Sequence, residues 1–372
     1  MKKKISQIII LVSLIVFLFL PIPLWKIIGG NAALTNNENR SLTEKPVFKL
    51  DSYESYPSEY EKYLNDSIPF RNQYIELNSS IDYFLFNRSS NAKVIKGKEQ
   101  WLFYDNVNDG DPLGCYKGEN LLSDEELKSL AQKLKNIDKE LKGQDKEFVL
   151  MIVPNKERVY SEYMPEYYGS PADINVASQI YDYLSENTEI KVVYPYSELI
   201  ESKEKCAYDL YYKSDTHWNW LGGYVGASQL LGKLSVEIPP VDSADLSFEE
   251  NGNYSGDLAA MLNMKNVLSD IDKDYSIKGY GGDKTTVIQN DFNGVFEYQT
   301  EGADERSIYI IRDSFCTHMA PYIGSSFSRS YMRHRGSYSY DELKDVDADI
   351  VVYEAAERYV KDLLNFEFIE EK

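Results

Sequence analysis

The chain has little histidine, little cysteine and a shortage of positive charge. It contains three histidines and three cysteines in 372 residues, and 60 acidic against 40 basic residues leave a formal net charge of −20. This excess of negative charge repels nucleic acid, anionic lipid and strongly anionic polymers at long range. No nucleic-acid partner is therefore expected, and a neutral or locally guided substrate is the better hypothesis.

The cysteines exclude two other classes of protein. Cys115, Cys206 and Cys316 are too few for a disulfide framework and too irregularly spaced for a zinc site. No motif calls for a metal or a cofactor. In an exported protein, Cys115 and Cys206 are the pair to test for a disulfide. Cys316 stands two residues after Ser314, and a small buried side chain is a better interpretation of it than a catalytic thiol.

A hydrophobic run at the N-terminus indicates the compartment. Three lysines at positions 2–4 precede an almost uncharged run over residues 8–28. Roughly 20 apolar residues can cross a bilayer about 30 Å thick, and the lysines favour a cytoplasmic N-terminus. A cleaved signal peptide is the alternative, because Gly30-Asn31-Ala32-Ala33 offers small residues for cleavage. We expect an uncleaved single-pass anchor in the cell membrane, with the following domain extracellular.

Composition then divides the chain into three parts. Residues 1–30 hold the cytoplasmic tip and the transmembrane signal anchor. Residues 31–90 form an extracellular juxtamembrane helical segment, because aromatic residues recur there at helical spacing: Tyr53, Tyr56, Tyr60 and Tyr63. Residues 91–372 form the catalytic domain, with an insertion rich in turn residues at about 238–300. This insertion either recognises substrate or is a β-rich excursion without contact to it.

From Val94 onward, strand patterns alternate with helix patterns. Strands are expected at residues 101–104, 148–153, 191–196, 307–311 and 350–353, and helices at 123–143, 177–187 and 221–234. The first of these helices begins at Ser123, an N-cap followed by an acidic first turn. The alternation predicts an α/β fold, a parallel sheet with helices on both faces in an α/β/α sandwich.

The most informative motifs are Ser214-Asp215-Thr216-His217-Trp218-Asn219 and Arg312-Asp313-Ser314-Phe315. An Asp-x-His pair alone is often structural, but residues i and i+2 of an extended segment share a face. Ser314 follows an expected strand at the sheet edge where α/β proteins place their sites. A carboxylate, an imidazole and a hydroxyl together make serine nucleophilic at neutral pH. We predict Ser314 as nucleophile, His217 as general base and Asp215 as the residue that orients it.

Several nearby residues are candidates for supporting roles. The backbone N–H of Ser314 would help to stabilise an oxyanion, and Asn155, just beyond a core strand, is a candidate second donor or a turn residue. Asp313 is expected to accept hydrogen bonds from its own turn. His318 is either an alternative base or a local helix contact.

Trp218 and Arg333 are the candidate substrate-binding residues. Arg333 belongs to the densest basic cluster in the chain: Arg329, Arg333, His334 and Arg335. Such a cluster could hold an anionic group of an acceptor, but pairing with surface carboxylates is the better interpretation.

The motifs resemble those of the DHHW proteins and of AlgJ and AlgX, SGNH-hydrolase-like proteins of alginate acetylation. Besides the two blocks in this order, four segments carry the resemblance: Glu38-Asn39-Arg40 with Pro46, residues 63–71, residues 101–104, and Val153-Pro154-Asn155-Lys156 leading to Tyr160. It covers nearly the whole chain after about residue 38. Two positions differ. Thr216 stands where the family name implies a second histidine, and Arg312 where SGNH hydrolases have glycine.

The resemblance implies O-acetyl transfer to an extracellular polysaccharide. The implied partners are a polysaccharide acceptor and a membrane-bound O-acyltransferase that supplies the acyl group. Two alternatives stay open: a carbohydrate acetylesterase and a non-catalytic polysaccharide assembly factor. Transfer and hydrolysis pass through the same acyl-enzyme, so the residues do not separate them.

Overall fold

The computed structural model describes residues 2–28, 41–280 and 282–369, which fall into two compact units. The first unit holds residues 1–91 and 259–267, and the second holds residues 92–258 and 268–372. Two segments quoted from the sequence, Gly30-Asn31-Ala32-Ala33 and Glu38-Asn39-Arg40, lie outside the described residues.

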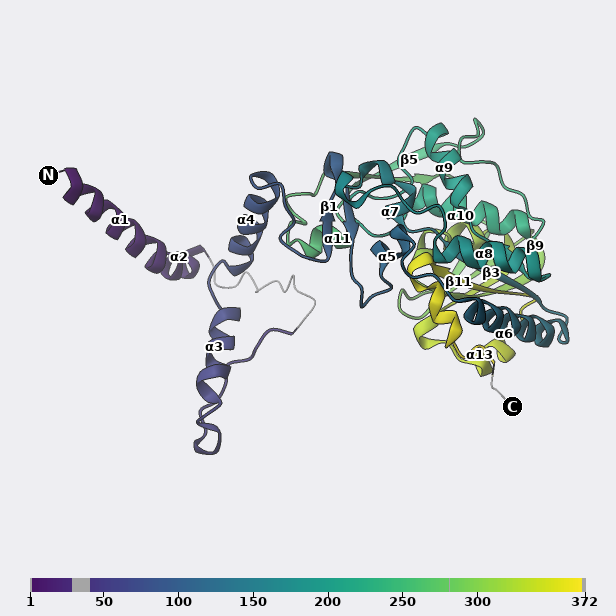
Figure 1. Cartoon of the computed structure of the whole chain (residues 1–372), viewed down its shortest axis with the longest axis horizontal. Helices are drawn as coiled ribbons and strands as arrows, with labels where there is room; N and C mark the ends of the chain where they lie inside the picture. Colours follow the sequence, from purple (N-terminus) through teal and green to yellow (C-terminus); the bar gives the residue numbers. More distant parts are fainter. Residues whose placement is uncertain (1, 29–40, 281, 370–372) are drawn as a thin grey trace. The chain divides into compact units, whose positions relative to one another are not determined.

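The first unit is helical. Its helices are α1 (Lys2–Phe19), α2 (Pro21–Ile28), α3 (Tyr56–Asp66) and α4 (Arg71–Phe84) (Figure 1). Tyr56, Tyr60 and Tyr63 lie half-buried along one face of α3, so their spacing correctly predicted a helix. Thr43 is tied to the end of α3, because its N–H and Oγ1 each donate to the Asp66 carboxylate at 2.9 Å. Among the helices that the structure describes, none has the length and apolarity required to cross a membrane.

A seven-stranded sheet forms the centre of the second unit. Its spatial order is β4 (Lys191–Val193), β3 (Glu147–Val153), β11 (Ile350–Ala356), β9 (Asp304–Arg312), β10 (Phe327–His334), β8 (Val295–Thr300) and β7 (Thr285–Asn290). The first five strands are parallel, whereas β8 and β7 are antiparallel to their neighbours. The prediction of a parallel sheet is therefore wrong at this edge. Part of the expected insertion is a β-hairpin, whose short turn makes its strands antiparallel, and the hairpin pairs with β10.

Helices cover both faces of the sheet. One face packs against α6 (Asp124–Lys142), α8 (Val176–Asn187) and α13 (Tyr340–Val346), which lie together in Figure 1. The other packs against α9 (Tyr196–Lys205), α10 (Trp220–Lys233) and α12 (Ala320–Gly324). Alternate residues of β3 enter the two cores, Phe148 and Leu150 on one face and Val149 and Met151 on the other, as the two-residue period of a strand requires.

Local signals in the sequence predicted the main helices well. α6 begins at Ser123 with a capping box, in which Glu126 N–H donates to the Ser123 hydroxyl and the Glu126 carboxylate accepts from Ser123 N–H. α8 and α10 each begin within one residue of the expected position. The observed α/β/α arrangement confirms the fold class, with a mixed rather than a parallel sheet.

Short elements complete the fold at the sheet edges. The two-stranded pairs are β1 (Val94–Lys96) with β2 (Leu102–Tyr104), and β5 (Phe248–Tyr254) with β6 (Asp272–Ile277). The short helices are α5 (Pro112–Lys117), α7 (Lys156–Val159) and α11 (Asp257–Met261). The loops after β3, β9 and β11 leave the same carboxyl edge of the sheet, because these strands are parallel.

Candidate active site

Ser314 lies at the carboxyl end of β9, in a turn held by buried charged groups. Asp313 accepts from Phe315 N–H of its own turn at 2.8 Å, as expected, and also from Ala356 N–H of β11 at 2.7 Å. Asp313 N–H donates to the fully buried Glu354 at 2.9 Å. The turn is therefore fixed to β11, while Ser314 itself stays partly exposed.

Arg312, the departure from the glycine of SGNH hydrolases, points away from the nucleophile. Its guanidinium is completely buried, lies 3.9 Å from the centroid of the Phe296 ring and donates to the carbonyls of Asp291 and Phe292. It therefore joins the nucleophile turn to the turn of the β7–β8 hairpin.

His217 joins Ser314 to Asp215. The distance from His217 Nε2 to Ser314 Oγ is 2.7 Å, and the distance from His217 Nδ1 to Asp215 Oδ1 is 2.6 Å. His217 N–H also donates to Asp215 Oδ1. An antiparallel bridge between Tyr211 and Trp218 closes the loop, which places residues 215 and 217 on one side. The structure thus brings together the three residues predicted from the sequence.

The electrostatics of the pair favour a protonatable imidazole. Burial opposes the charged form of His217, but the charge of Asp215 and its hydrogen bond outweigh burial and raise the pKa of His217. Burial acts against the Asp215 carboxylate too, yet His217 and two backbone N–H groups hold its pKa well below its ordinary value. His217 keeps a side-chain exposed fraction of 19%, so it is accessible while its partner is almost covered.

The loop after β5 fixes the second oxygen of Asp215, and the sequence did not predict this. Tyr254 OH and Asp257 N–H donate to Asp215 Oδ2 at 2.8 and 2.9 Å. Asp257 in turn accepts from Thr216 N–H and Thr216 Oγ1. A Cβ on Gly256 would lie 2.3 Å from Asp215 Cβ, so only glycine allows this approach. The only sequence signal in this region was the group of turn residues at 251–254, which does not indicate that Asp215 is their partner.

Lys156 holds the other side of the same loop. Its buried Nζ donates to the carbonyls of Tyr212 and Lys213 at 3.0 and 3.2 Å and also to the carbonyl of Asp215. Burial lowers the pKa of Lys156 to about 8. The motif around Pro154 pointed to this lysine but not to its role.

Two candidates for substrate binding have structural roles instead. Trp218 has no exposed surface, and its Nε1 donates to the Phe315 carbonyl at 2.9 Å, so it supports the nucleophile turn from within the core and cannot contact a substrate directly. Arg333 forms an ion pair with Glu342 through two nitrogens. Arg329 and Arg335 pair with Glu297 and Asp362. Pairing with carboxylates therefore explains the basic cluster.

The remaining candidates fall into different environments. Asn155 is buried just after β3, and neither atom of its amide has a hydrogen-bond partner among the described residues. His318 is also close to His217, with ring centroids 6.5 Å apart. Burial and the charge of His217 lower the pKa of His318 to about 3.

The cysteines are all free thiols. Cys115 belongs to the core on one face of the sheet, whereas Cys206 packs against the core on the other face. A Cys115–Cys206 disulfide is therefore absent, because the sheet separates the two residues. Cys316 is completely buried, and burial raises the pKa of its thiol well above the ordinary value, as for an inert core side chain.

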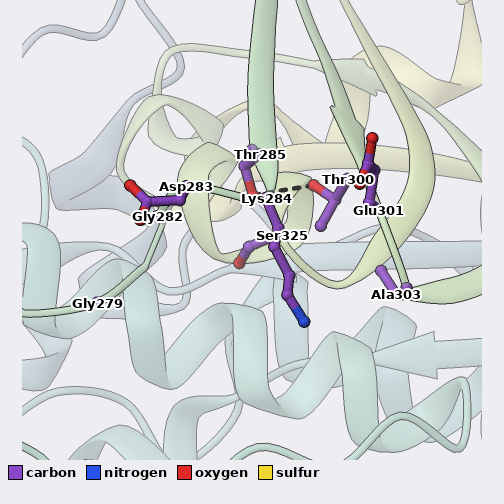
Figure 2. A pocket seen from close by; sticks show the side chains of 10 residues that line it. Gly279, Gly282, Asp283, Lys284, Thr285, Thr300, Glu301, Ala303 and Ser325 are labelled. Carbon is purple, nitrogen blue, oxygen red and sulfur yellow. Dashed lines mark hydrogen bonds between the residues drawn. The ribbon is translucent and has the colours of Figure 1, made fainter.

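Two other features have the form of a ligand site. Side-chain atoms of Asp215, His217 and Asp257 all lie within 4.8 Å of one another, a spacing that suits a metal ion, although hydrogen bonds already engage these groups. A hollow of about 440 Å³ lies at the opposite, amino edge of β9 and β10, lined by residues that include Lys284, Thr300 and Ser325 (Figure 2). None of the predicted site residues lines it.

Comparison with known proteins identifies the family of the chain. The family described as "SGNH hydrolase-like domain, acetyltransferase AlgX" matches residues 94–341, about two thirds of the chain. The chain belongs to this AlgX family. The match includes both blocks that carry Asp215, His217 and Ser314, and it leaves out the helical first part of the chain.

Individual relatives are more distant. A probable alginate O-acetylase AlgJ of Pseudomonas syringae pv. tomato is 25% identical over 216 residues, which cover 57% of this chain and 51% of the relative. The chain thus spans about half the length of the curated relatives it matches. Among solved structures, Bacillus cereus PatB1 has a TM-score of 0.52 at 16% identity, covering 73% of this chain and 99% of the other. A DHHW family protein from Eubacterium siraeum has a TM-score of 0.52 at 15% identity, with 75% and 99% covered. These two likenesses concern the fold alone.

Proposed function

We propose that this AlgX-family chain is a serine O-acetyltransferase that acts outside the cell membrane on a cell-surface or secreted polysaccharide. The observation that carries the proposal is the hydrogen-bond chain from Asp215 through His217 to Ser314. In this mechanism neutral His217 accepts the Ser314 proton, Oγ attacks the acetyl carbonyl, and Asp215 keeps the imidazole in the required tautomer. A sugar hydroxyl, activated by His217, then attacks the acetyl-enzyme.

The proposal that the acyl group is acetyl and that the acceptor is a glycan rests on the relatives. Curated relatives are named as probable alginate O-acetylases, and the matching family is described as an acetyltransferase. A polysaccharide acceptor follows from that name, and a membrane-bound O-acyltransferase is the proposed acyl donor. The proposed anchor consists of α1 and α2, which are hydrogen-bonded across Leu20 and leave apolar side chains such as Ile10 exposed.

Mass spectrometry of the purified protein after incubation with an activated acetyl ester tests the proposal. We expect one acetyl group on a peptide containing Ser314, and no such adduct in Ser314→Ala. Acetylation at another residue, or of Ser314→Ala to the same extent, would contradict the mechanism.

Two further outcomes decide between the open alternatives. If free acetate exceeds acetyl transfer to every added glycan, the chain is an acetylesterase. If a Ser314→Ala strain keeps normal glycan acetylation, the chain acts as a non-catalytic assembly factor.

A further inference from the structure

The carboxyl edge of the sheet brings a second polar pair beside the nucleophile. In the parallel register Val153 is the partner of Ala356, and Tyr353 is the partner of Ile311. Asn155 comes two residues after Val153, and Arg358 comes two residues after Ala356. In the other pair of strands, Ser314 comes three residues after Ile311, and Ala356 comes three residues after Tyr353. Ala356 N–H donates to Asp313 at 2.7 Å, so the end of β11 contacts the nucleophile turn.

Arg358 is a buried cation that forms no ion pair with the described residues. Its exposed fraction is 8%, its Nε has no hydrogen-bond partner, and no ion pair joins it to a described acidic residue within 4.0 Å, in contrast to Arg329, Arg333 and Arg335. Its guanidinium instead lies among aromatic rings, 5.2 Å from the centroid of Phe315 and 4.9 Å from that of Tyr359. Burial opposes the charge of Arg358, but Tyr359, Asp313 and Glu157 compensate it and raise the pKa of the guanidinium. Its Nε still has no partner among the described residues.

The surrounding chain holds this arginine in place. Gly110 allows the loop before α5 to approach the backbone of Arg358 closely, since a Cβ at position 110 would lie 2.6 Å from the Arg358 carbonyl oxygen. The ring of Phe315, the residue after Ser314, is near both the guanidinium and His217, whose ring centroid is 4.7 Å from that of Phe315. The positive charge of Arg358 reaches His217 and lowers its pKa. The Arg358 Nε and the Asn155 amide are therefore unpartnered buried donors that follow β11 and β3 at the same edge of the sheet as the nucleophile turn.

We propose that Arg358 is a further catalytic residue, which with the Asn155 amide donates hydrogen bonds to the oxyanion formed when Ser314 attacks an acyl ester. This rests on the proposed function. As the Oγ–C bond forms, the Ser314 proton moves to His217 and the carbonyl electron pair moves to oxygen, where Arg358 compensates the negative charge. When the intermediate collapses, the carbonyl re-forms, the donor C–O bond breaks, and His217 returns the proton to the leaving alkoxide. Preorganised donors of this kind act on the transition state.

The first test is Arg358→Met, which keeps the apolar contacts with the rings and removes the charge. On a neutral chromogenic acetyl ester, we expect kcat to fall about 100- to 1,000-fold with little change in KM. Arg335→Met is the matched control, because Arg335 also lies against the Tyr359 ring but has its own partner, Asp362. It should retain the wild-type rate.

A pH profile adds a readout that a purely structural arginine would not move. The charged and titratable groups around His217 are Asp215, Asp257, His318 and Arg358. Without the Arg358 charge, the pKa of His217 should rise, and the acidic limb of the residual activity should move to higher pH. Added guanidinium ion should restore part of the rate of Arg358→Ala.

Several results would overturn the inference. A near-normal kcat in Arg358→Met, or a loss confined to KM, would assign Arg358 to structure or to substrate binding. If Arg358→Met fails to fold by its melting profile, Arg358→Ala replaces it, and an unchanged kcat there, or a reduced kcat that added guanidinium ion does not raise, has the same consequence. Ser314→Ala is measured in parallel: if Ser314→Ala is active, the proposed function fails, whereas an inactive Ser314→Ala with a fully active Arg358 variant refutes only the inference.

Discussion

At the scale of single residues, the site depends on the balance around His217. Burial disfavours the charged form of His217, but the charge of Asp215 and its hydrogen bond favour that form more strongly, so the pKa of His217 is raised. The base must be neutral to accept the Ser314 proton, so activity belongs to the pH range above the pKa of His217.

Ester hydrolysis should therefore increase with pH through a midpoint above about 6.5, the ordinary value for histidine. Asp215→Asn removes the charge that raises this pKa, so its smaller residual activity should have a midpoint at lower pH. Initial rates on a chromogenic acetyl ester between acidic and alkaline pH measure both midpoints. A wild-type midpoint clearly below 6.5 would contradict the assignment of His217 as the base.

His318 provides the contrasting case. It is close to His217, but burial and the neighbouring imidazole lower its pKa to about 3, and its Nδ1 has no partner among the described residues. It therefore stays neutral and has no carboxylate to orient it. We expect His318→Ala to retain most of the esterase rate and His217→Ala to lose nearly all of it. The reverse pattern would transfer the role of base to His318.

At the scale of elements, the end of β5 and the start of α11, which lies between β5 and β6, hold the Asp215 carboxylate. Tyr254→Phe removes one hydrogen bond to a buried charge, a loss of about 1.5–3 kcal/mol. We expect a lower melting temperature and a lower kcat, with a smaller effect on kcat than Asp215→Asn. Tyr275→Phe is the control, because Tyr275 belongs to the same strand pair and stacks on Tyr208. Equal behaviour of the two variants would show that the hydroxyl of Tyr254 does not matter.

Lys156 joins a second element to the same loop. Lys156→Met should leave the carbonyls of Tyr212, Lys213 and Asp215 without their buried donor, at about 1–3 kcal/mol for each unsatisfied group. The expected result is a large drop in thermal stability together with loss of activity, measured by calorimetry and ester hydrolysis. A variant of normal stability and rate would mean that water replaces the ammonium group.

At the scale of the whole molecule, the N-terminal segment and the catalytic unit should be separable in function. Deleting residues 1–30 behind a cleavable export signal should preserve ester hydrolysis in vitro but lower glycan acetylation in cells, because a tether raises the effective concentration near a membrane-bound donor. The full-length protein should be found in the membrane fraction and be digested by external protease in cells without a wall. Normal acetylation by the released domain would contradict the need for the tether.

A longer deletion should behave differently. Residues 259–267 belong to the first unit, where Asn91 Nδ2 donates to the Met261 carbonyl and Asn266 Nδ2 donates to Glu76. Removing residues 1–91 leaves this segment without those partners. We expect that shorter chain to melt at a lower temperature than the chain lacking residues 1–30, as differential scanning fluorimetry would measure.

The sequence by itself determined the features that depend on local pattern. The uninterrupted apolar run of residues 148–153, followed by Pro154, and the cap at Ser123 indicated the strand and the helix that the structure contains. The motifs around His217 and Ser314 were recognisable because the spacing Asp-x-His and a serine after a buried strand are readable along the chain. The hydrogen bond from Phe315 N–H to Asp313 could be predicted for the same reason, since it lies within one turn, whereas the bonds of Asp313 to β11 could not.

Only the tertiary structure decided the rest, because it depends on residues that meet across long stretches of chain. The β7–β8 hairpin belongs to the sheet because β8 pairs with β10, and the periodicity of the local sequence does not predict this pairing. Tyr254 and Lys156 reach the loop of Asp215 from 39 and 59 residues away. The distance between Cys115 and Cys206 depends on which face of the sheet each one packs against. Arg358 lies beside the nucleophile turn because β11 pairs with β9 and β3, and strand order is a property of the folded sheet rather than of any segment.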